Sequence, residues 1–115
     1  ERLHSFNDEP SFIKGNQKKW HKNGKLHRED GPAIEHDNGS VSYYKNGKLH
    51  KEDGPAVIEK FSSFDEVIYS WYYKGTIIDL EKVKEICKVN NLNEDYTKWS
   101  DKDKKLFKKS FKVKK

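Results

Sequence analysis

The sequence predicts a mainly β chain, an array of antiparallel β-hairpins closed by C-terminal α-helices. Two observations lead to this fold class. A stretch that begins near residue 20 returns almost unchanged near residue 43, so that Gly24 maps onto Gly47 with a period of 23 residues. After residue 79 the period of the apolar residues changes from two to 3.6. A unit this short cannot bury a core alone, so neighbouring units must shield one another's apolar faces.

The hairpin array is predicted to occupy residues 1–78, and residues 79–115 are predicted to form a helical cap with a basic tail. Near the end of the array, Lys74 and Ile78 replace the Asn and His of the good copies. Such a loss is typical of a capping unit, because its outer face meets something other than another unit. The predicted units are a degenerate copy, two good copies and a capping copy: residues 1–19, 20–42, 43–70 and 71–78.

Asn-Gly pairs predict hairpin turns at residues 23–24 and 46–47. A type I′ turn needs positive φ at both central residues, and Asn followed by Gly tolerates this best. Residues 37–40 predict a second turn of similar chemistry. A third turn is predicted at each Asp-Gly pair, where the following proline, Pro32 or Pro55, directs the chain into the next strand.

Large aromatic residues recur at one position of the unit. Trp20, Tyr43 and Trp71 are equivalent in the alignment of the copies, and we expect their rings to form an aromatic ladder along the array. Alternation along residues 67–73 places Trp71 on one face of a strand. Each ring is expected to cover one aliphatic side chain of a neighbouring unit: Leu26, Leu49 or Ile77.

Two helices are predicted beyond the array. Asp79 is an acceptable N-cap for the first, which should end at residues 90–91. Ser100 and Asp103 form a capping box for the second. We expect both helices to close the open end of the sheet, with Trp99 anchoring their connection. The residues of the two apolar faces are Leu80, Val83, Ile86 and Cys87, and then Leu106, Phe107 and Phe111.

Composition bounds the class of protein. Hydrophobic residues make up 32% of the 115 residues and charged ones 37%, which favours a thin, largely hydrated sheet in which aromatic rings supply most of the burial. Cys87 is the single cysteine, so a scaffold held by intrachain disulfides is excluded. No apolar run of membrane-spanning length and no signal peptide is present. We therefore expect an intracellular protein, cytoplasmic or virion-associated, and further sequence upstream of Glu1, where the chain opens inside a unit.

Positive charge is concentrated in the tail. Residues 101–115 hold eight lysines and two aspartates, whereas residues 1–100 carry a net charge of −1. Such a run is either a solvated helix face or a basic surface that meets the phosphates of anionic lipid or nucleic acid. For the second interpretation the candidate anion-binding residues are Lys104, Lys105, Lys108, Lys109 and Lys112.

The string aromatic-x-x-Asn-Gly-Lys-x-His, at residues 20–27 and 43–50, resembles the MORN repeat. In this chain the histidine is followed by x-Glu-Asp-Gly-Pro, a variant similar to divergent arrays of large DNA viruses, phages and some bacteria. The resemblance implies rows of antiparallel hairpins that serve in protein contacts, in self-association and sometimes in attachment to membrane lipids.

His27 and His50 each lie close in sequence to a Glu-Asp pair, which is a pattern compatible with metal ligation or acid–base catalysis. Because the same group occurs in both good copies, the stronger interpretation is that it builds the unit: the carboxylates accept turn hydrogen bonds and the imidazoles pack or bond locally. No catalytic residue, metal ligand or cofactor is predicted, and no nucleophile elbow, phosphate loop or zinc spacing occurs.

The sequence therefore predicts a non-catalytic module for protein–protein interaction or assembly, with a second protein or another copy of itself as the partner. The alternative is a binder of anionic surfaces through the lysine tail. The second good copy is longer than the first, and residues 60–65 make up the additional length. We expect them to form an extended hairpin or a loop that contains Phe61. The predicted contact residues are Tyr44, Tyr72 and Phe64, together with Trp20, Tyr43 and Trp71 of the ladder.

Overall fold

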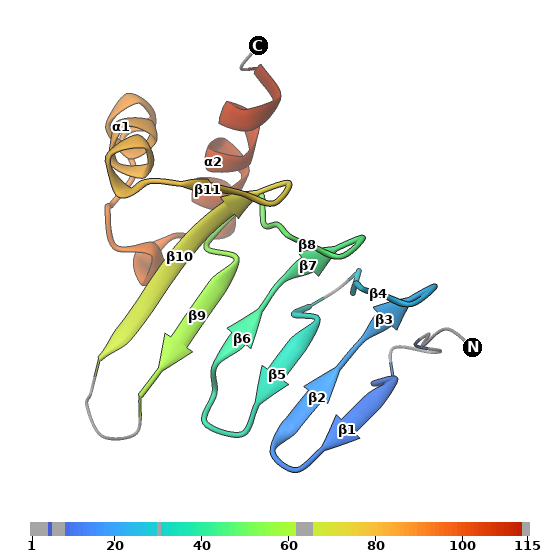
Figure 1. Ribbon diagram of the computed structural model, residues 1–115. Helices are drawn as coiled ribbons and strands as arrows, with labels where there is room; N and C mark the ends of the chain where they lie inside the picture. Colours follow the sequence, from blue (N-terminus) through green and yellow to red (C-terminus); the bar gives the residue numbers. More distant parts are fainter. Residues whose placement is uncertain (1–4, 6–8, 30, 62–65, 114–115) are drawn as a thin grey trace.

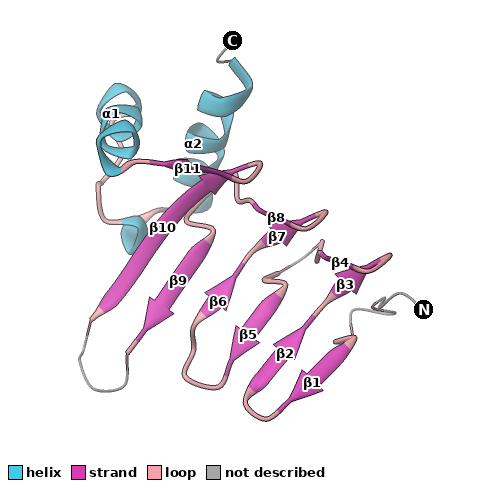
Figure 2. Cartoon of the chain, viewed as in Figure 1, coloured by secondary structure: helices cyan, strands magenta, loops and turns pink. Residues whose placement is uncertain are grey.

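The computed structural model describes residues 5, 9–29, 31–61 and 66–113, with side chains described as far as Ser110. The chain is mainly β, with 34% strand and 24% helix. One antiparallel sheet forms a single layer, and both helices gather at one end of it (Figure 2). The fold class is thus a sheet of antiparallel hairpins followed by two C-terminal helices.

Seven strands form the main sheet, and each pairs antiparallel with its neighbours. In sheet order they are β1 (Phe12–Lys14), β2 (Gln17–Lys19), β5 (Ile34–His36), β6 (Val41–Ser42), β9 (Val57–Lys60), β10 (Val67–Tyr73) and β11 (Thr76–Ile78). Two further hairpins pair β3 (His21–Lys22) with β4 (Lys25–Leu26), and β7 (Tyr44–Lys45) with β8 (Lys48–Leu49). In Figure 1 the hairpins β3–β4, β7–β8 and β10–β11 follow one another along one edge.

The predicted Asn-Gly turns are confirmed. Asn23 and Gly24 have φ angles of 51° and 85°, and Asn46 and Gly47 have 50° and 84°. The turn between β10 and β11 has the same geometry without asparagine, since Lys74 and Gly75 adopt φ angles of 51° and 86°. Positive φ at both central residues is what a type I′ hairpin requires, so three hairpins of one geometry stand in series.

The aromatic position interrupts two long strands. Trp20 lies between β2 and β3, and its N–H donates to the carbonyl of Ala33 at 2.8 Å. Tyr43 lies between β6 and β7 and makes the equivalent bond to Ala56 at 2.7 Å. Both alanines are fully buried. The main-chain bonds therefore tie each hairpin to the strand that follows it in the sheet.

The rings of these residues are covered differently from the prediction. The guanidinium of Arg28 lies 3.7 Å from the centre of the Trp20 ring, and Lys51 Nζ lies 4.2 Å from that of Tyr43. Such cation–π contacts contribute roughly 0.5 to 2 kcal/mol each, depending on burial. Ile77, which was expected beneath a ring, is 62% exposed. Each cation comes from the unit that carries the ring, because it follows the last strand residue of the hairpin by two positions and lies back over the ring.

The predicted helices and their caps are confirmed. Helix α1 (Leu80–Asn90) begins at Asp79, whose Oδ1 accepts from the N–H of Lys82 at 2.9 Å. After a 3₁₀ turn, η1 (Tyr96–Lys98), helix α2 (Asp101–Val113) begins with the reciprocal bonds of Ser100 and Asp103. Leu80 was predicted on the apolar face but is exposed, because it lies at the first position of the helix, outside the contact.

The helices build the main core of the described chain against β10. Trp71 packs on the rings of Trp99 and Phe107, with centroid distances of 5.8 and 5.3 Å. Cys87 is buried in this cluster, and burial raises the pKa of its thiol. The cluster comprises Trp71, Val83, Ile86, Cys87, Leu92, Trp99 and Phe107. The ring of Trp71 is therefore covered by the helical cap, where Trp20 and Tyr43 are covered by a cation.

Gly54 sets the distance at which the cap docks. A Cβ added to this buried glycine would lie 2.6 Å from Cε1 of Tyr96, so Gly54→Ala should destabilise the fold by about 1–3 kcal/mol through overpacking. Urea unfolding followed by tryptophan fluorescence measures this loss. In a Tyr96→Ala background the same substitution should cost much less, and equal losses in both backgrounds would contradict the steric explanation.

Candidate functional site

Adjacent hairpins are joined through the turn of the later one. Nδ1 of His27 accepts the N–H of Asn46 at 2.9 Å, and the carbonyl of Leu26 accepts the N–H of Gly47 at 2.8 Å. The next junction repeats this arrangement. Nδ1 of His50 accepts the N–H of Lys74 at 2.7 Å, and the carbonyl of Leu49 accepts the N–H of Gly75 at 2.8 Å.

These bonds define the chemical state of both histidines. Because Nδ1 accepts a main-chain hydrogen bond, the proton of the neutral ring lies on Nε2. Nε2 of His27 faces Glu29 Oε2 at 2.7 Å, and Nε2 of His50 faces Glu52 Oε2 at 3.6 Å. The bond from His27 lowers the pKa of Glu29. Both imidazoles are buried with each ring nitrogen facing a partner, which is the arrangement of a structural histidine.

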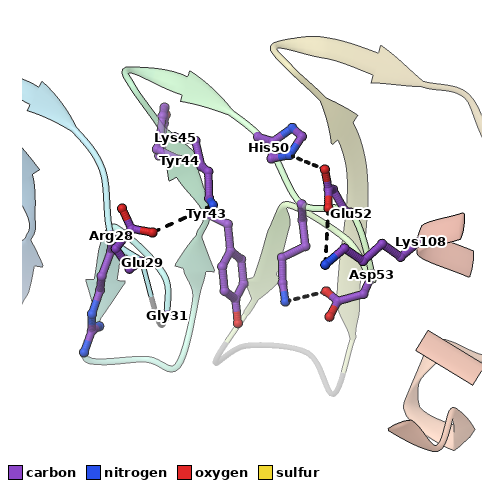
Figure 3. Close-up of a pocket in the computed structure, with 11 residues that line it drawn as sticks. Arg28, Glu29, Gly31, Tyr43, Tyr44, Lys45, His50, Glu52, Asp53 and Lys108 are labelled. Carbon is purple, nitrogen blue, oxygen red and sulfur yellow. Dashed lines mark ion pairs between the residues drawn. The ribbon is translucent and has the colours of Figure 1, made fainter. Parts of the chain in front are cut away.

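A groove of about 210 Å³ lies between the loops that follow the first two hairpins and helix α2 (Figure 3). It brings together the basic and acidic residues of the two units, and Lys108 reaches into it from α2. The residues that line it are Arg28, Glu29, Gly31, Tyr43, Tyr44, Lys45, His50, Lys51, Glu52, Asp53 and Lys108.

The charges in this groove are paired with one another. Lys51 Nζ lies 3.0 Å from Asp53, and Glu52 lies 3.6 Å from Lys108 Nζ. Lys45 reaches to within 4.0 Å of Glu29. The pair of Glu29 with Lys45 therefore connects the first loop to β7, and the pair of Glu52 with Lys108 connects the second loop to α2. Within the described residues, His, Cys, Asp and Glu side chains form no group of three or more suited to holding a metal ion.

The structure separates the predicted contact residues into two sets. Trp20 and Trp71 are only 4% and 6% exposed, so their rings serve the interior. Tyr43 is half-buried beneath Lys51. Tyr44 and Tyr72 are half-buried, and Tyr72 lies on the side of β10 opposite Trp71 because successive strand residues alternate. Phe64 lies outside the described residues, and its neighbour in the predicted loop, Phe61, is exposed.

Each of the two tyrosines is paired across its hairpin with an aliphatic residue. Tyr44 is the cross-strand partner of Leu49, and Tyr72 is that of Ile77. Partners in register lie on the same face of a hairpin. We call these four residues the hairpin face: Tyr44, Leu49, Tyr72 and Ile77. Leu49 and Ile77 were not among the predicted contact residues, although the type I′ turn fixes which residues face each other and could have identified them.

The predicted anion-binding lysines also divide. Lys108 pairs with Glu52, and Lys104 lies 5.7 Å from the ring of Tyr96. Lys105 and Lys109 are exposed, and so is Lys102, which was not among the predicted anion-binding residues. These three, the lysine stripe, lie at helical spacings of three and four residues on one side of α2. Lys112 lies where side chains are not described.

Comparison of the chain with protein families, with curated proteins and with solved structures finds no match. Among the described helices, none combines the length and the apolar character that crossing a membrane requires. The site therefore has to be interpreted from its own geometry.

The acceptor at Nδ1 can be tested in the first junction. His27→Ala would leave the N–H of Asn46 without its partner, which should cost about 1–3 kcal/mol together with the lost packing. His27→Asn places an amide oxygen near the position of Nδ1 and should recover part of that loss. Urea unfolding of the two variants measures the difference, and equal stability of the two would show that the acceptor contributes nothing.

Proposed function

We propose that the hairpins form a MORN-like repeat array that acts, without catalysis, as a module for protein–protein interaction. The observation that carries this proposal is the hairpin face. It presents two half-buried tyrosines and two aliphatic residues on successive hairpins, and Ile77 at its end is 62% exposed. Tyrosine is enriched at protein interfaces because a rigid ring offers a large contact area and its hydroxyl can still form a hydrogen bond.

Preorganisation favours this face over a loop as a contact. The junction at His50 and Leu49 holds the second and third hairpins in one relative position, because His50 Nδ1 accepts from the N–H of Lys74 and the Leu49 carbonyl accepts from that of Gly75. A partner that binds both hairpins therefore pays little ordering entropy. Tyr72 lies outside the core cluster, because Trp71, on the opposite side of β10, supplies the buried ring.

The geometry of the histidines supports a non-catalytic role. A general base needs a ring nitrogen that can reach substrate. In both histidines Nδ1 accepts from main-chain N–H and Nε2 faces a carboxylate. The arrangement is repeated at separate junctions and does not converge on one reacting centre.

Two substitutions on the hairpin face test the proposal. Tyr72→Ala and Ile77→Asp should each lower the affinity for a bound protein, by about tenfold or more if either residue is an interface anchor. The measurement is quantitative crosslinking and capture of partners, with light scattering after size-exclusion chromatography to detect binding between copies of the chain. Lys18→Ala, on the exposed part of β2, is the matched control and should retain binding. Retained binding in both face variants would exclude this surface.

A second candidate function is binding to an anionic surface, and the lysine stripe is the observation that favours it. Lys102, Lys105 and Lys109 are exposed, and none has an ion pair to a described residue. On the inner side of α2, Phe107 is fully buried and Leu106 packs against the core. The apolar face of the helix is therefore used inside the protein, so contact with phosphates would be purely electrostatic and steeply dependent on salt.

Replacing the three stripe lysines by glutamine tests this candidate. Binding to single-stranded RNA or to phosphatidylserine vesicles should weaken, and with RNA the logarithmic salt dependence should become shallower by roughly two, since about three phosphate contacts are lost. Lys104→Gln is the control on the same helix, because Nζ of Lys104 lies over the ring of Tyr96. Unchanged binding and an unchanged salt slope in the triple variant would exclude the stripe as an anion-binding surface.

A further inference from the structure

The two histidine junctions share their main-chain bonds but differ in the charges around the imidazole. Nε2 of His27 lies 2.7 Å from Glu29. Nε2 of His50 lies 3.6 Å from Glu52, and that carboxylate also pairs with Lys108 of α2 at 3.6 Å. Because Glu52 lies farther from its histidine than Glu29 does, it compensates less well for a positive imidazole.

Other groups around His50 oppose a positive charge. Lys45 on β7 and Lys74 in the turn of the next hairpin both act on it as cations, and Glu52 is the carboxylate that favours protonation. The ring of Tyr73 lies 4.9 Å from the imidazole centroid and covers one side of it. Burial, the largest effect, lowers the pKa of His50 below its ordinary value, and the two lysines act in the same direction.

Protonation would also remove a structural hydrogen bond. Nδ1 accepts the N–H of Lys74 at 2.7 Å, and a proton on Nδ1 would turn this acceptor into a second donor. The junction would then keep the bond from Gly75 N–H to the Leu49 carbonyl, at 2.8 Å, and that from Lys51 N–H to the Tyr72 carbonyl, at 3.2 Å. Loss of one bond of three, with two like donors facing each other, loosens the joint without removing it.

We propose that His50 is an acid-sensitive joint: its protonation loosens the attachment of the β10–β11 hairpin to the β7–β8 hairpin. The joint responds to acid whether or not the hairpin face binds a partner.

The direction of the pH effect follows from linkage. The folded chain holds the proton on His50 more weakly than the unfolded chain does, so between the two pKa values the unfolded state binds more protons. Stability therefore rises with pH in this window. The stability that the neutral imidazole of His50 contributes is fully present above the ordinary histidine pKa of 6.5 and is lost as the pH falls below that value.

Urea unfolding of the full chain at about pH 7.5 and about pH 5.0 tests the joint. The urea midpoint of the wild type should fall on acidification by more than that of His50→Asn, whose amide oxygen accepts from Lys74 but does not titrate. Carboxylates and the other histidines are common to both chains and cancel in the comparison. Glu52→Gln removes the group that favours protonation and should enlarge the fall. An equal fall in wild type and His50→Asn would overturn the proposal.

Nitrogen-15 NMR of the wild type provides a test that does not depend on a folded variant. At about pH 7.5 Nδ1 of His50 should have the shift of an unprotonated ring nitrogen, and the amide of Lys74 should titrate with the imidazole at a midpoint below the ordinary value. A proton on Nδ1 at neutral pH, or a Lys74 amide that does not follow the titration, would overturn the proposal.

Discussion

The arrangement of the hairpins depends on hydrogen bonds from the turn of one hairpin to the hairpin before it. A type I′ turn offers two main-chain N–H groups, and a histidine Nδ1 and a leucine carbonyl accept them at both junctions. Buried or half-buried N–H groups without partners are costly, so the acceptors stabilise the stacked state over separate hairpins. The contact is directional, since at both junctions the earlier hairpin supplies the acceptors and the later one supplies the turn donors.

The last hairpin shows how this series is closed. Ile78 occupies the position of the histidine and packs against the core of the helical cap. The cap also replaces the cation that covers the aromatic ring in the other units, because Trp99 and Phe107 lie on Trp71. The equivalent glycines, Gly31 and Gly54, show the same replacement of a cation by a group of the cap. Gly31 lies against the guanidinium of Arg28, and Gly54 lies against the ring of Tyr96.

Because the helical cap covers one side of the sheet, the two sides have different roles. Burial of Trp20 and Trp71, with the ion pairs of the groove, stabilises the side that carries the cap. On the other side Tyr72 lies outside the core cluster and Ile77 is 62% exposed, so both are available to the proposed contact. Charge is divided in a similar way: Lys104 and Lys108 contact described groups of the protein, whereas the stripe faces water.

Sequence patterns predicted the parts of this structure that local chemistry controls. The turns at Asn23 and Asn46 depend on the φ preference of two adjacent residues, and the cap at Asp79 depends on one side chain and a main-chain N–H three residues away. Such features need no knowledge of distant residues. The mainly β class and the change to helices after residue 79 followed from periodicity for the same reason.

Tertiary structure alone decided which side chain meets which. His27 bonds to a turn 19 residues away and His50 to one 24 residues away, so their Nδ1 partners were hidden from any local pattern. The cover of the Trp20 ring by Arg28, the exposure of Leu80 and the pairing of Lys108 with Glu52 depend on how units and cap pack in three dimensions. Sequence by itself determined backbone conformation where preferences are local; burial, charge pairing and hydrogen-bond partners were decided by packing, because they depend on residues that only the fold brings together.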